Sequence, residues 1–151
     1  MMSGTIMSSI SIFCYGTLMS PNVLARVLFN KRDLPSNSPL SLTPATLHNH
    51  SRSRLIDESY PAIVKSEGSS VAGVLVSELT PAQVKTLDAF EGDEYERQKV
   101  QVVNENGQAV DAWCYIWVDR LDRLTGVDWD FDEFMQNRFK TWIEGEMSAM
   151  E

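Results

Sequence analysis

The pattern of apolar and polar residues divides most of the chain into short segments that predict strands. Residues 10–15 and 110–118 are apolar on both faces, residues 71–79 are predominantly apolar, and residues 95–103 include a stretch that alternates with period two. Weaker extended signals cover residues 45–49, 53–56 and 60–64, with a Gly/Ser turn predicted at residues 67–70. A strand that is apolar on both faces lies inside a structure or lines a cavity. Gly73, inside one of these strands, indicates a close backbone approach or a bend.

Three other segments carry helix signals. A serine followed by proline begins one helix at residues 20–21, and a capping box begins another at residues 80–83, with Gly92 as its stop. A third helix, rich in aromatic residues, is expected from about residue 130 to 147. The Asn-Gly pair at residues 106–107 predicts a hairpin between the last two strands.

Several of these strands follow one another without a helix between them, which is typical of an α+β protein. Six or so short strands with apolar faces predict a small mixed β-barrel with flanking helices and a C-terminal helix. The length of 151 residues favours a single domain, which we expect over residues 10–147 after a flexible tail at residues 1–9. The polar segment 30–43, with two prolines, is expected to be a loop.

Composition and charge exclude some classes of function. The net charge of −8 argues against nucleic-acid binding and against a membrane-surface role, since both need a basic patch. No apolar run approaches the ~18 residues of a membrane span, and the N-terminus lacks a signal-peptide pattern. The two cysteines, Cys14 and Cys114, lie in apolar runs and are interpreted as buried free thiols. A cytoplasmic location is expected.

One carboxylate occupies an unusual position. Glu91 follows Val84 by seven residues, about two helical turns, so it lies on the same face as the apolar Leu87 and Phe90. It would also end the helix, where the helix dipole disfavours negative charge. Burial and dipole would both raise its pKa, which is typical of a functional group. The alternative is that the helix ends one residue earlier and Glu91 turns to solvent.

Four blocks in order resemble the γ-glutamylcyclotransferase-like superfamily, and within it the avirulence-gene-induced-like and γ-glutamylamine cyclotransferase branch. The blocks are residues 13–18 (FCYGTL), residues 60–64 with 71–75, residues 87–92 with Tyr95 and Arg97, and residues 112–117. They cover most of the chain. One departure is Thr17, which replaces the usual serine of the first block.

The resemblance implies an enzyme that cyclises a γ-glutamyl amide to 5-oxoproline and releases an amine or amino acid. Glu91 would be the general acid/base. No metal or cofactor is implied, and the partner would be a small molecule with a γ-glutamyl group, bound by a monomer or homodimer. Residues expected to bind the substrate are Tyr15, Gly16, Thr17, Leu18, Tyr95 and Tyr115.

Other interpretations stay open. The protein could instead be a tailoring enzyme for γ-glutamyl or glutathione-derived conjugates, favoured if Trp113, Trp117 or Trp142 lined the pocket. It could also be a non-catalytic binding module on the same scaffold. Residues 16–17 could be a simple strand-to-helix turn, and the tyrosines could be core residues. Tyr60 is interpreted as packing, and the arginines at 52 and 54 as a solvated strand face rather than the rim of a site for acidic substrates.

Overall fold

Five strands form a closed barrel in the computed structural model, which describes residues 9–138. Their order around the barrel is β1-β3-β2-β4-β5. All the pairings are antiparallel except that of β1 with β5, which is parallel and pairs Ile12 with Trp113. The mixed α+β barrel is confirmed, with five strands in place of about six. Their bounds are β1 (Ile10–Cys14), β2 (Ser41–Arg54), β3 (Pro61–Leu79), β4 (Tyr95–Asn104) and β5 (Ala109–Trp117).

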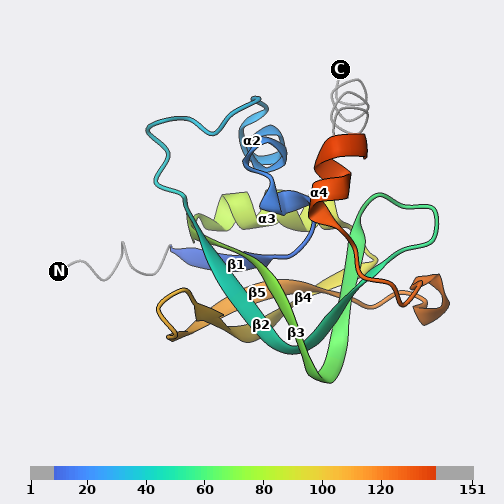
Figure 1. Ribbon diagram of the computed structural model, residues 1–151. Coiled ribbons are helices and arrows are strands. Elements are labelled where there is room, and N and C mark those ends of the chain that lie inside the picture. The colour runs from blue at the N-terminus through green and yellow to red at the C-terminus, as the bar shows by residue number, and fades with distance from the viewer. Residues whose placement is uncertain (1–8, 139–151) are drawn as a thin grey trace.

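The strand count is lower because β2 and β3 are long and each absorbs two predicted strands. The turn predicted at residues 67–70 is wrong: these residues stay inside β3. The register between β2 and β3 shifts between His48 and His50, and Asn49 and Gly68 have φ angles of 60° and 85°. Such an irregularity bends a strand without removing it from the sheet. Figure 1 shows both strands curving around the barrel.

The helices begin where their capping signals predict. In α2 (Pro21–Phe29) the Ser20 hydroxyl accepts a hydrogen bond from the amide of Val23, and α3 (Pro81–Glu91) has the complete Thr80–Gln83 capping box. Asp130 caps α4 (Phe131–Glu133), which continues as η3 (Phe134–Arg138). The rest of the predicted C-terminal helix and the tail up to residue 8 lie outside the described residues. Short 3-10 turns are η1 (Thr17–Met19) and η2 (Leu121–Arg123).

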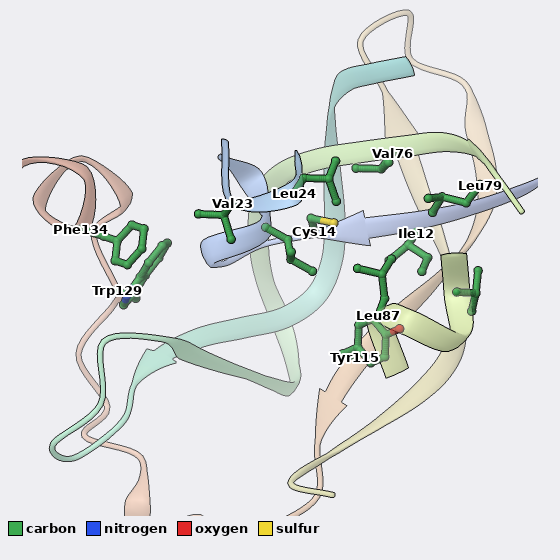
Figure 2. Packing of buried hydrophobic residues seen from close by; sticks show 12 residues of the cluster. Ile12, Cys14, Val23, Leu24, Val76, Leu79, Leu87, Tyr115, Trp129 and Phe134 are labelled. Carbon is green, nitrogen blue, oxygen red and sulfur yellow. The ribbon is translucent and has the colours of Figure 1, made fainter. Parts of the chain in front are cut away.

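Two apolar clusters lie on opposite faces of β1 and β5. One fills the barrel and includes Phe13, Cys114 and Ile116. The other lies between the barrel and the helices α2 and α3, which cover the same side of the barrel (Figure 1), and Figure 2 shows part of it. The two-sided apolar pattern of these strands is thereby explained. Cys14 and Cys114 are both buried and free, as expected.

The strand glycine at position 73 marks a close approach between β1 and β3. A Cβ atom on Gly73 would lie 2.4 Å from the carbonyl oxygen of Cys14 and 2.7 Å from the ring of Phe13. The expected close approach is confirmed. It allows β1 to lie tightly against β3 just before the turn that follows Cys14.

Across residues 9–138 we find no helix with the length and apolar character needed to span a membrane.

Candidate active site

A cavity of about 310 Å³ opens where several elements meet at the end of β1. Its walls come from the turn after β1, the start of β3, the last turn of α3, the start of β4, and β5. The seven residues that the sequence singled out all line it and come from three of the four blocks; Tyr60 and Pro61 add the remaining block. The lining residues are Phe13, Cys14, Tyr15, Gly16, Thr17, Leu18, Tyr60, Pro61, Phe90, Glu91, Glu94, Tyr95 and Tyr115.

The turn after β1 supplies hydrogen-bond donors to the cavity wall. Within residues 9–138, the backbone N–H groups of Gly16, Thr17 and Leu18 have no hydrogen-bond acceptor. Gly16 packs against the ring of Pro61, where a Cβ atom would come within 2.9 Å of two ring carbons. Unpaired amides close to a helix N-terminus are suited to an anion. The turn therefore places three backbone N–H groups in residues that line the cavity.

Arg52, on β2, contacts the backbone of this turn. Its Nη1 donates to the carbonyl oxygen of Tyr15 at 2.9 Å, and its Nε donates to Asp128 at 2.8 Å. Arg54 pairs with Glu133 at 2.7 Å. The interpretation of a solvated strand face is wrong for Arg52, whose side chain is only 15% exposed, whereas Arg54 is 36% exposed; neither arginine lines the cavity. The backbone position of this turn therefore depends on its hydrogen bond with Arg52, which no local sequence pattern predicts.

Glu91 ends α3 and lies half-buried in the cavity wall. No hydrogen bond reaches its carboxylate from the described part of the chain. Burial, followed by the negative charge of Asp88, raises the pKa of Glu91 to about 8. The alternative of a shorter helix with a solvent-facing Glu91 is wrong. A carboxyl group in this state can exchange a proton near neutral pH.

Tyr15, Tyr95 and Tyr115 each donate their hydroxyl hydrogen to an acceptor within the protein. Tyr15 donates to the carbonyl oxygen of Tyr115 at 2.6 Å, and Tyr95 donates to that of Pro61 at 2.7 Å. Tyr115 donates to Oδ1 of Asp88 at 2.8 Å. Burial raises the pKa of all three phenols, so they stay neutral. Each phenolic oxygen can then only accept a further hydrogen bond.

The sequence interpretation missed two polar residues of the cavity. Tyr60, interpreted as packing, lines it and donates to Glu94 at 3.3 Å; burial raises the pKa of Tyr60 to about 12. Glu94 also accepts a hydrogen bond from Arg123, which pairs with Glu58 at 3.3 Å. The one available signal was that Glu94 directly precedes Tyr95, and its contacts depend on the distant segment around Arg123.

The tryptophans considered for the pocket pack outside it where the structure describes them. The ring of Trp113 packs beneath Arg97, and the ring of Trp117 packs against Arg123 and Tyr95. Neither lines the cavity, and Trp142 is outside the described residues. No group of three or more His, Cys, Asp or Glu side chains between residues 9 and 138 is arranged to hold a metal ion.

Comparison of the chain with known proteins identifies its family. The family described as "Gamma-glutamyl cyclotransferase, AIG2-like" matches residues 12–131. The chain belongs to this family. The AIG2-like protein B of Arabidopsis thaliana is 34% identical to it over 142 residues, which is 93% of this chain and 78% of that protein.

Two solved structures share the fold. The solution structure of an Arabidopsis thaliana protein superposes with a TM-score of 0.68 at 30% identity, covering 95% of this chain and 82% of that one. A structure named "Gamma-glutamyl cyclotransferase" superposes with a TM-score of 0.60 at 14% identity, covering 95% and 88%. At that identity the second likeness concerns the fold alone.

Proposed function

We propose that this member of the family is a γ-glutamylcyclotransferase that converts a γ-glutamyl amide to 5-oxoproline and releases an amine or amino acid. The observation that carries the proposal is the carboxyl group of Glu91. It has no hydrogen-bond partner among the described residues, its pKa is raised to about 8, and it shares one cavity with the unpaired amides of the turn after β1. Membership of the family supports the same reaction class.

The two sides of the cavity differ in hydrogen-bonding character, and this supports one orientation of the substrate. The amides of Gly16, Thr17 and Leu18 are donors and suit the α-carboxylate or the developing oxyanion. The tyrosine oxygens are acceptors, and so is Glu91 in its ionised form, which a pKa of about 8 leaves partly populated near neutral pH; both suit the N–H groups of the α-amine. A γ-glutamyl group carries both kinds of group on one carbon atom, so it can bind both walls together.

The reaction is an intramolecular aminolysis. The α-amine nitrogen forms a bond to the γ-carbonyl carbon, and the bond from that carbon to the amide nitrogen then breaks. Glu91 would take the proton that the attacking amine loses and return it to the departing nitrogen. Since both reacting groups belong to one substrate, the protein mainly has to fold the substrate and transfer protons.

The cavity size bears on the tailoring-enzyme alternative. A volume of about 310 Å³ is at the lower end of the ~300–1,000 Å³ range of ligand pockets. The tryptophans that would have favoured a large aromatic conjugate do not line it within the described residues. These observations favour a γ-glutamyl group with a compact leaving group.

The test is a 5-oxoproline assay on purified wild-type protein and the Glu91→Gln variant. The substrates are γ-glutamyl amino acids, γ-glutamyl-ε-lysine, glutathione and glutathione conjugates. We expect release from at least one substrate and a loss of at least about 100-fold in the variant. The matched control is Glu105→Gln, an exposed glutamate in the β4–β5 hairpin, which should keep wild-type turnover.

Three outcomes separate the alternatives. Near wild-type turnover in Glu91→Gln would mean that Glu91 is not the acid/base. Ligand-induced stabilisation without any product would identify a binding module. Activity confined to glutathione conjugates would identify the tailoring enzyme.

A further inference from the structure

Asp88 lies outside the cavity but contacts its wall. It is one helical turn before Glu91 on α3. Its Oδ1 accepts hydrogen bonds from the hydroxyl of Tyr115 at 2.8 Å and from Nε of Arg97 at 2.9 Å. Nη2 of Arg97 donates to the second oxygen, Oδ2, at 3.3 Å. Asp88 therefore links a bidentate ion pair to a tyrosine of the cavity.

Arg97 is held in this position from β4 and β5. It is paired directly across the sheet with Tyr115, and its guanidinium carbon lies 4.6 Å from the ring centroid of Trp113. Lys99 contacts the same ring, with Nζ 5.0 Å from the centroid. Of these two cations, Arg97 alone reaches Asp88. The sheet register, more than helix α3, thus decides how the charge of Asp88 is balanced.

We propose that Asp88 and Arg97 are a positioning pair for the acid/base group. Asp88 acts on Glu91 through its charge and on Tyr115 through its hydrogen bond. Arg97 acts through Asp88: it balances that charge and fixes the carboxylate that orients the phenol. For its consequence in turnover this inference rests on the proposed function, but the charge coupling itself does not.

The other groups near Glu91 leave Asp88 as the main charge that acts on it. β1 contributes Cys14 and the turn after it Tyr15, β4 contributes Tyr95, and β5 contributes Cys114 and Tyr115. Burial raises the pKa of every one of these groups, so all are neutral near pH 7. Glu94, also in the wall, and Tyr60 bind each other, and Glu94 is paired with Arg123.

A positioning role for Asp88 and Arg97 predicts shifts in the pKa of Glu91 that a purely structural role does not predict. Removing the negative charge with Asp88→Asn should lower the pKa of Glu91, because a like charge disfavours ionisation. Removing the positive charge with Arg97→Gln should raise it, because Asp88 is then unbalanced. If the ion pair only stabilised the fold, both variants would lose the same contact and would not shift the carboxyl titration in opposite directions.

The experiment is a carbon-13 NMR titration of glutamate side-chain carboxyl groups in the full chain, between pH 5 and 10. The resonance of Glu91 is identified by its absence in Glu91→Gln. We expect the pKa to fall by about one in Asp88→Asn and to rise by about 0.5 in Arg97→Gln, sizes that reflect the partial exposure of the pair. Lys99→Gln is the matched control and should leave it unchanged, since Lys99 shares the Trp113 ring but not the contact with Asp88.

Arg97→Lys tests the charge separately from the bidentate geometry. It should leave the pKa of Glu91 close to the wild-type value while weakening the orientation of Tyr115, seen as reduced turnover with an unchanged pH profile. If Asp88→Asn does not fold, the contrast between Arg97→Gln and Arg97→Lys decides alone. Shifts in the same direction, or no shift in Arg97→Gln, overturn the proposal.

The two proposals fail separately. If no γ-glutamyl amide yields 5-oxoproline, the proposed function fails, whereas the titration still reports the coupling between Asp88 and Glu91. If turnover is observed but the carboxyl titrations do not separate, the positioning pair fails and the cyclotransferase assignment stands.

Discussion

Replacing the Glu91 carboxyl group should make the protein more stable at neutral and alkaline pH. Its pKa is raised from 4.5 to about 8 in the folded protein, so folding favours the protonated form. The stabilisation that this proton gives is complete below pH 4.5 and is lost as the pH rises toward 8. Glutamine has nearly the same shape and does not titrate, so Glu91→Gln should escape this loss.

The size of the effect follows from the pKa difference. A difference of one in pKa corresponds to about 1.4 kcal/mol, which gives an upper limit of about 3 kcal/mol at pH 7. Glu91 is half-buried, and water in the cavity reduces this to about 1–3 kcal/mol. For a chain of this length that corresponds to a rise in Tm of roughly 2–10 °C.

The assay is urea unfolding of wild-type protein and Glu91→Gln at each pH from 5 to 9. The free-energy difference in favour of the variant should grow with pH and level off above pH 8. A constant offset from the new amide does not affect this trend, and Glu105→Gln in the exposed hairpin should show no trend. A difference that stays flat or shrinks with rising pH would refute the reasoning that Glu91 is held protonated by burial.

Three further substitutions test other parts of the molecule, each by thermal and urea unfolding. Gly73→Ala should destabilise by about 2–3 kcal/mol, since the new Cβ would meet the carbonyl oxygen of Cys14, a backbone atom that cannot move aside; a change below about 0.5 kcal/mol would contradict the close approach. Tyr15→Phe should cost about 1–2 kcal/mol by leaving the buried carbonyl of Tyr115 unpaired, and unchanged stability would count against that hydrogen bond. Arg26→Met should stabilise by about 1–3 kcal/mol, because Nε and Nη1 of this buried guanidinium have no hydrogen-bond partner among the described residues; a lower Tm would indicate a partner beyond them.

The hydrogen-bonding character of the tyrosines changes what the cavity can recognise. The sequence predicts only that Tyr15, Tyr95 and Tyr115 bind the substrate, not what their hydroxyl groups do. In the structure Tyr15, Tyr95 and Tyr115 each donate to a protein acceptor, so a ligand meets only acceptor oxygens on that wall. Such a wall favours a ligand that brings its own N–H groups, as an amine does.

The sequence determined the elements whose signals are local. The proline and capping box at residues 80–83 determine where α3 begins, and Gly92 ends it, so the helical period alone placed Glu91 on the face of Val84 and Leu87. The Asn-Gly pair marked the β4–β5 hairpin in the same way. These features depend on neighbours within a few residues, which is the range over which capping, turn chemistry and periodicity operate.

Only the tertiary structure decided the features that depend on strand register and barrel closure. Three features are of this kind. Four predicted strands merge into β2 and β3, Arg52 contacts the carbonyl oxygen of Tyr15, and Asp88 forms an ion pair with Arg97. Each joins residues that no local sequence pattern brings together. A one-residue change of register would turn Arg52 of β2 and Arg97 of β4 to the other face of the sheet. Seven residues of the cavity wall can therefore be found in the sequence, whereas the contacts of Tyr60 and Glu94, and the protonation and hydrogen-bonding of the wall, are set by the closed barrel.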